Sequence, residues 1–150
     1  MRTRRSIDTH VDIDAPVQAV WEAVTDLERY RDWNPFIIDA SGRIEAGARL
    51  HLRMQRPMKT EEETHTPTVT ALHEGRLLQW SGIIKHPAFF RARHSFVLEE
   101  RDGGVRLRQL EEFGGLSMPL AGAMVWRIEQ GFMLMNAALK VRAESLVAAS

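Results

Sequence analysis

The sequence contains no cysteine. This absence excludes a disulfide framework, a metal site built on thiolates and a cysteine nucleophile. An excess of charge of one sign is also missing, because 20 basic residues balance 20 acidic ones. A chain without a positive field does not attract phosphate backbones, so we expect no nucleic-acid partner.

Long apolar runs are missing as well. The longest segment without charged or strongly polar side chains extends only from Met118 to Trp126, whereas a membrane-spanning helix needs about 20 apolar residues. The basic start, Met1 to Ser6, is followed by alternating polar and apolar residues rather than by the apolar core of a signal peptide. We therefore expect no integral membrane segment and a cytoplasmic location.

What is present is the composition of a folded domain. The chain has 150 residues, of which 44% are hydrophobic and 27% charged. Single domains commonly contain about 100–150 residues, and no repeat or linker interrupts this sequence. Residues 1–150 are therefore expected to form a single domain.

The first part of the chain predicts one strand and two short helices. Polar and apolar side chains alternate strictly from Ile7 to Asp14, which indicates a half-buried strand. Pro16 suits the first turn of a helix, and apolar residues then recur at helical spacing from Val17 to Val24. Thr25 to Glu28 is typical of a capping box that opens a second short helix, which Asn34-Pro35 ends.

From Phe36 to Phe113 the pattern changes to strands. The segment 60–73 is polar and rich in threonine, which favours one long strand with an exposed face. Glu74-Gly75 and Asp102-Gly103 are turn signals that predict two hairpins. The expected strands are 37–41, 49–54, 60–73, 76–84, 89–100 and 104–113.

The chain ends in a predicted long helix. Ser117 can cap this helix, Pro119 suits its first turn, and apolar residues recur at helical spacing as far as Val147. Because the strands form one block and the helix must pack against them, the fold class is α+β with an antiparallel sheet.

Four segments together resemble a known group of proteins. The segment from Val20 to Phe36 is similar to the opening of START-like (SRPBCC) domains, and more narrowly of the polyketide cyclase/dehydrase-like group. Leu78 to Gly82 resembles the central strand of that group, Glu111 to Leu116 its last strand, and Met135 to Lys140 its final helix. The resemblance implies a helix-grip (Bet v 1-like) fold: a curved antiparallel sheet of about seven strands around a long C-terminal helix, with two short helices after the first strand.

The resemblance also implies an apolar cavity between the sheet and the final helix. Members of the group bind lipids, hormones or polyketides, and a minority are enzymes. The chain is therefore expected to bind a small hydrophobic or aromatic molecule, with a polyketide cyclase or dehydratase as one alternative. A protein-interaction module, such as a homodimer, is another, because Trp126, Met133 and Leu134 lie off the main apolar stripe of the final helix.

The turn at Asp102-Gly103 predicts the register of the last hairpin. If these two residues form the loop, His94 faces Glu111 on an otherwise apolar inner face. The outer face then pairs opposite charges, Glu99 with Arg106 and Arg93 with Glu112, which supports the same register. An imidazole beside a carboxylate in an apolar cavity can be a structural pair, a ligand contact or an oriented general base.

These patterns give a set of candidate residues. The six histidines are scattered without zinc-ligand spacing, and no phosphate-binding glycine loop occurs, so we expect neither a metal nor a cofactor. Trp80 is expected to face Val69 across the other hairpin and to point inward. The residues expected to contact the ligand are Trp33, Phe36, Leu52, Met54, Val69, Trp80, His94, Phe96, Gln109, Glu111, Phe113, Met124, Ile128 and Met135, with His94 and Glu111 as the only catalytic candidates.

Overall fold

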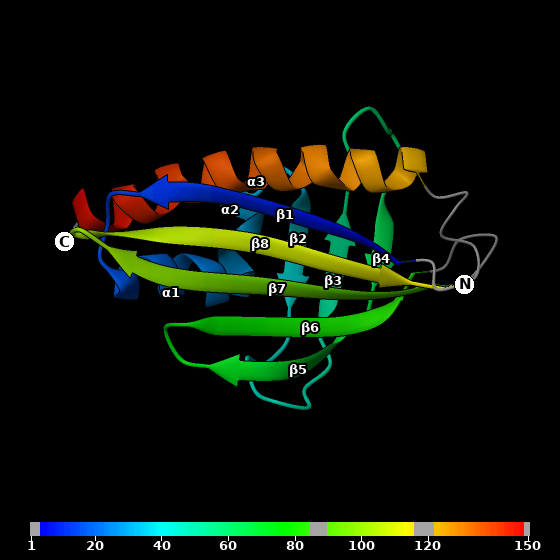
Figure 1. Ribbon diagram of the computed structural model, residues 1–150, viewed down its shortest axis with the longest axis horizontal. Coiled ribbons are helices and arrows are strands. Elements are labelled where there is room, and N and C mark those ends of the chain that lie inside the picture. Colours follow the sequence, from blue (N-terminus) through cyan, green and yellow to red (C-terminus); the bar gives the residue numbers. More distant parts are fainter. Residues whose placement is uncertain (1–3, 85–89, 116–121, 149–150) are drawn as a thin grey trace.

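The computed structural model describes residues 4–84, 90–115 and 122–148. The elements in chain order are β1 (Arg4–Ile13), α1 (Val17–Thr25), the short 3-10 helix η1 (Leu27–Arg29), α2 (Tyr30–Trp33), β2 (Ile37–Ser41), β3 (His51–Met54), β4 (Glu63–His65), β5 (Thr68–His73), β6 (Leu77–Ile84), β7 (Phe90–Arg101), β8 (Gly104–Gly114) and α3 (Gly122–Ala148). The expected α+β helix-grip arrangement is confirmed, since a curved antiparallel sheet packs against the long helix α3 and the short helices follow β1 (Figure 1).

The strands form two antiparallel groups that are joined through β5. Five strands lie in the order β1-β8-β7-β6-β5, and three lie in the order β2-β3-β4. Backbone hydrogen bonds of 2.8 Å connect Gly47 N to the carbonyl of Val69, and Val69 N to the carbonyl of Ala48. The chain that leads into β3 therefore continues the sheet beyond β5.

The segment 60–73 departs from the expected single strand. Its polar residues form β4 and β5, which are separated by Thr66 and Pro67. Pro67 has no N–H to donate to a strand ladder, so it breaks the strand. After the break β5 pairs with β6, whereas β4 pairs with β3 instead. The described residues thus form eight strands rather than about seven.

The predicted capping box is also wrong. The hydroxyl of Thr25 donates to the carbonyl of Trp21 at 2.7 Å, one turn back along α1. Its side chain is therefore unable to cap the next helix, and α1 continues through Thr25. η1 and α2 follow without a side-chain cap.

The two hairpins test the predicted registers. In β7–β8 every expected pair is confirmed, including His94 with Glu111. In β5–β6 Trp80 faces Val69 as expected. A two-residue turn at Glu74-Gly75 also predicts that Leu78 faces Ala71, but Leu78 faces Leu72 instead. The reason is that the turn holds one residue more than expected, and a bulge between Val69 and Ala71 restores the register before Trp80.

The helix α3 lies along β1 and is held to the sheet by a buried polar network (Figure 1). The Gln109 amide donates to Oδ1 of Asn136 at 2.7 Å, and the Asn136 amide donates to Oγ1 of Thr9 at 2.9 Å. Met135 and Leu139 are buried on the same side of the helix. The expected start at Ser117 and Pro119 lies outside the described residues, and no described helix is long and apolar enough to cross a membrane.

Candidate functional site

A pocket of about 340 Å³ opens between β2–β4, the β6–β7 pair and the first part of α3. Its volume lies at the lower end of the range of about 300–1,000 Å³ that small-molecule sites occupy. The wall is formed by Phe36, Ile37, Arg49, Leu52, Met54, Arg56, Glu63, His65, Thr66, Pro67, Thr68, Trp80, Ser81, Gly82, Ile83, Ala92, His94, Glu111, Met124 and Ile128. Two cationic and two acidic side chains occur among these residues, so the ionised groups of the wall balance.

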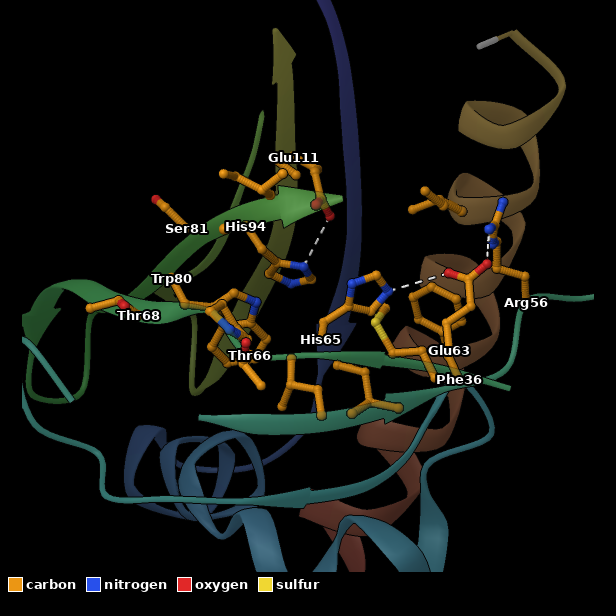
Figure 2. A pocket seen from close by; sticks show the side chains of 18 of the residues that line it. Phe36, Arg56, Glu63, His65, Thr66, Thr68, Trp80, Ser81, His94 and Glu111 are labelled. Atoms are coloured by element: carbon orange, nitrogen blue, oxygen red, sulfur yellow. Dashed lines mark hydrogen bonds and ion pairs between the residues drawn. The ribbon is translucent and has the colours of Figure 1, made fainter. Parts of the chain in front are cut away.

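The predicted pair of His94 and Glu111 forms one polar part of this wall. Nδ1 of His94 lies 3.2 Å from Oε2 of Glu111, and their side chains are only 3% and 10% exposed. The β7–β8 register places them opposite each other, and both are in the pocket wall (Figure 2). Nε2 of His94 is buried and has no hydrogen-bond partner among the described residues.

Aromatic rings fix the orientation of the His94 imidazole. The indole of Trp80 stacks on it, with ring centres 5.0 Å apart and planes 29° apart. Phe96 and Phe132 contact the imidazole from other directions, with centre distances of 4.6 Å and 4.7 Å. The ring is thus enclosed by apolar groups except where it meets Glu111 and the pocket.

A second histidine–carboxylate pair lies on the opposite wall. Nε2 of His65 lies 3.3 Å from Oε2 of Glu63, and the same carboxylate forms an ion pair with Arg56. Figure 2 shows the imidazoles of His65 and His94 extending toward each other across the pocket, one from β4 and the other from β7. The pocket therefore has an oriented imidazole on each side.

Burial affects the charge of these groups. Burial lowers the pKa of His65 below that of an ordinary imidazole; Glu111 acts in the opposite direction, and Arg56 adds to the lowering. Burial also lowers the pKa of Arg56, and the neighbouring Arg127 adds to this effect. His65 is consequently neutral at neutral pH, with one nitrogen that can accept a hydrogen bond.

Phe36 is held in the pocket wall from two sides. Oδ1 of Asn34 accepts hydrogen bonds of 2.9 Å from the backbone N–H groups of Phe36 and Ile37, which fixes the turn into β2. On the other side the ring lies against Gly131 of α3, where a Cβ atom would come within 2.5 Å of it. The absence of a side chain at Gly131 therefore lets Phe36 pack directly on the helix.

The structure brings eight of the fourteen candidate residues together in the pocket wall. These are Phe36, Leu52, Met54, Trp80, His94, Glu111, Met124 and Ile128. The other six are not part of the wall: Trp33, Val69, Phe96, Gln109, Phe113 and Met135.

The six residues outside the wall have other surroundings. Val69, Phe96, Phe113 and Met135 are at most 1% exposed, because the hydrophobic core fills the space around them. Gln109 contacts Asn136 instead of the pocket, and Trp33 packs edge-on against Tyr30. Alternation along a strand identified the inward direction of the four strand residues among them correctly, but it carries no information on whether the space they face is filled.

Sequence reasoning missed the Arg56–Glu63–His65 wall. A single strand over 60–73 with an exposed face, as the composition predicts, gives Glu63 and His65 no place in the pocket. The available signal was Pro67, since a proline inside a predicted strand indicates a break. With that break recognised, Glu63 and His65 fall on the same face of a separate short strand.

The outer side of α3 has a different character. Trp126, Met133 and Leu134 are between 50% and 53% exposed. They are absent from the pocket wall, as expected from their position off the buried stripe. Within the described ranges, no group of three or more histidine, aspartate or glutamate side chains could hold a metal ion.

Comparison with known proteins gives one family. The family described as polyketide cyclase/dehydrase and lipid transport matches residues 4–144. No curated protein matches the sequence.

Solved structures show the same fold at low sequence identity. The aromatase/cyclase Zhui from Streptomyces sp. R1128 superposes with a TM-score of 0.80 at 19% identity, covering 97% of this chain and 96% of that one. Ara h 8.0201 gives a TM-score of 0.73 at 14% identity, over 95% and 99% of the two chains. The di-domain ARO/CYC StfQ from the steffimycin biosynthetic pathway gives 0.78 at 10% identity, with 97% of this chain covering 52% of that one.

Proposed function

Since this chain belongs to the polyketide cyclase/dehydrase and lipid transport family, we propose that its pocket binds one small apolar or aromatic molecule between the sheet and α3. The observation that carries the proposal is the composition of the pocket wall. Aromatic and aliphatic side chains such as Phe36, Trp80 and Ile128 form much of it, and a few polar groups converge on the same space. This combination is typical of sites for small organic ligands.

The polar groups give the ligand an orientation. Trp80 offers a ring face next to His94, so a flat ligand can stack there while a polar substituent reaches the imidazole. His65 on the other wall offers a second polar contact. A lipid- or polyketide-like molecule, largely apolar with a small number of oxygen atoms, fits this arrangement.

A second candidate function is catalysis of a cyclisation or dehydration. The contact between His94 and Glu111 favours it, because a carboxylate that orients an imidazole makes the free nitrogen a better base. Two of the similar structures are the aromatase/cyclase Zhui and the di-domain ARO/CYC StfQ. In this function Nε2 of His94 would take a proton from a carbon next to a carbonyl group, and Glu111 would stabilise the imidazolium.

The binding proposal is tested by filling the pocket. Ala92 lies in the wall between β6 and β8, so Ala92→Phe should occupy the ligand space. Ala137→Phe on the exposed side of α3 is the matched control. Isothermal titration with 1-naphthol should give one saturable site in the wild type and in the control, and at least about a tenfold weaker site in Ala92→Phe. Equal affinity in all three proteins would contradict the proposal.

The catalytic candidate needs a separate assay. The probe is 2-tetralone in heavy water, whose hydrogens next to the carbonyl exchange for deuterium when a base removes them. Exchange faster than in buffer, and lost in His94→Phe, would support a general base. Exchange at the buffer rate with bound 2-tetralone would contradict catalysis and leave the binding function.

A further inference from the structure

The hydrogen-bonding direction at His94 can be derived from its partner. A glutamate carboxylate can only accept hydrogen bonds. With Glu111 ionised, the 3.2 Å contact between its Oε2 and Nδ1 of His94 places the donated hydrogen on Nδ1. In a neutral imidazole the other nitrogen, Nε2, is then a lone-pair acceptor.

This acceptor has no hydrogen-bond partner in the described part of the protein. Nε2 of His94 is buried, and the described residues provide no partner for it. A buried polar atom without a hydrogen bond destabilises a fold. Because His94 lies in the pocket wall, a ligand is the natural source of the missing donor.

The ring is unable to escape this arrangement by turning over. A half-turn of the imidazole would exchange Nδ1 with a carbon and break the contact with Glu111. Trp80 on one side and Phe132 on another also restrict its movement. The acceptor at Nε2 is therefore a fixed property of the pocket.

The opposite wall repeats the same chemistry. Nε2 of His65 faces the carboxylate of Glu63, so Nε2–H donates and Nδ1 is the acceptor. Burial favours the neutral form of His65. Both imidazoles thus offer acceptors, so a ligand group that meets either of them is favoured when it carries a hydrogen-bond donor.

On the basis of the proposed binding function, we infer that the pocket selects an apolar or aromatic ligand that bears a hydroxyl group, a phenol or an enol, and that this hydroxyl donates its hydrogen to Nε2 of His94. A ketone or ether in the same place would put two acceptors together. The proposed function concerns whether an apolar molecule binds, whereas this inference concerns the direction of its hydrogen bond.

The first test needs no ligand. Long-range proton–nitrogen NMR spectra of protein labelled with ¹⁵N-histidine distinguish the two neutral tautomers and the imidazolium. At about pH 8, above the ordinary imidazole pKa of about 6.5, His94 should show a protonated Nδ1 and an unprotonated Nε2. A proton on Nε2, in either the other tautomer or the imidazolium, would overturn the inference.

The second test compares three probes of similar shape: naphthalene, 1-naphthol and 1-methoxynaphthalene. 1-Naphthol should bind about tenfold more tightly than 1-methoxynaphthalene, which corresponds to about 1.4 kcal/mol. Binding of all three with equal affinity would overturn the inference and leave the proposed function intact. If none of the three binds, the proposed function fails and the inference fails with it.

Glu111→Gln separates hydrogen-bond direction from ligand size. A glutamine amide can either donate or accept, so it no longer fixes the tautomer of His94. The preference for 1-naphthol over 1-methoxynaphthalene should fall from about tenfold to about twofold or less. Glu112→Gln is the matched control, since Glu112 is the next residue and pairs with Arg93 on the exposed face; it should keep the tenfold preference. An undiminished preference in Glu111→Gln would overturn the inference.

Discussion

Two buried polar residues of β8, Gln109 and Glu111, lie two positions apart on the same face of the sheet, yet they have different surroundings. The Gln109 amide reaches across the interior and donates to Asn136 of α3. Glu111 instead contacts His94 on the neighbouring strand, and both line the pocket. One residue ties the helix to the sheet, and the other belongs to the space that the helix leaves open.

The difference shows what determines the role of a buried polar group. Both sites contain an atom without a partner among the described residues, Oε1 of Gln109 and Nε2 of His94. Of these two residues only His94 belongs to a pocket wall. An unpartnered atom is therefore informative about ligands when space for a ligand adjoins it, and otherwise it is a local cost of packing.

The largest loss of stability should come from placing a carboxyl group, like that of Glu111, at position 109. Gln109→Glu puts a carboxyl group at a site with no exposed surface, next to Oδ1 of Asn136. We expect a loss of about 3–5 kcal/mol in the free energy of unfolding near pH 7, as for other unpaired buried charges. The measurement is urea unfolding.

The pH dependence of Gln109→Glu has a definite sign. Burial raises the pKa of the introduced carboxyl in the folded protein. The loss in the free energy of unfolding should therefore be smallest below about pH 4.3, the pKa of a glutamate in the unfolded chain, and should grow as the pH rises. The reciprocal variant Glu111→Gln keeps a hydrogen bond to His94 and should cost only about 1 kcal/mol or less. Equal losses in the free energy of unfolding of the two variants would contradict the different roles of Gln109 and Glu111.

Gly131→Ala should cause an intermediate loss of stability. Gly131 lies in α3, on the side of the pocket that this helix forms. The new methyl group meets the ring of Phe36, which lies in the pocket wall. We expect a loss of about 1–3 kcal/mol from overpacking, reduced by about 1 kcal/mol because alanine favours a helix, together with weaker binding of 1-naphthol.

The control for this substitution is Gly114→Ala, where an added Cβ has no neighbour within 4 Å. Urea unfolding and titration of both variants measure the effect. A stabilised Gly131→Ala protein with unchanged affinity would show that Phe36 moves without consequence for the pocket.

The smallest effect on stability should come from replacing His65, which lies in the more exposed wall of the pocket. Because burial lowers its folded pKa, the unfolded chain takes up a proton first as the pH falls below about 6.5. This histidine therefore lowers stability on acidification. His65→Gln should flatten the decline in the free energy of unfolding between about pH 7 and pH 5, while the exposed His51→Gln serves as control. A steeper decline in His65→Gln would contradict the lowered pKa.

Local rules predicted one wall of the pocket well. Asp102 and Gly103 both have positive φ angles, as a two-residue hairpin turn requires. That turn alone fixes the pairing of His94 with Glu111 eight or nine residues away. The resemblance of the segment from Val20 to Phe36 gave the fold, and the family match agrees with it.

The rest of the site depends on distances that periodicity does not encode. Phe96 and Trp80 both point inward, but only Trp80 meets open space, because the path of α3 and its neighbours decides where the interior is filled. The wall with Glu63 and His65 depends on β4 leaving the line of β5 and pairing with β3. These are tertiary features, and a single sequence offers only Pro67 as a sign of them.

The measurement that tests the account most directly is an NMR titration of the ¹⁵N-labelled protein with 1-naphthol. The chemical-shift changes at the His94–Glu111 pair and at the Gln109–Asn136 pair report which of the two faces a ligand. The account predicts saturable changes at Trp80, His94 and His65, with Gln109 and Asn136 unaffected. Changes confined to Gln109 and Asn136, or to the exposed side of α3 around Trp126, would contradict it.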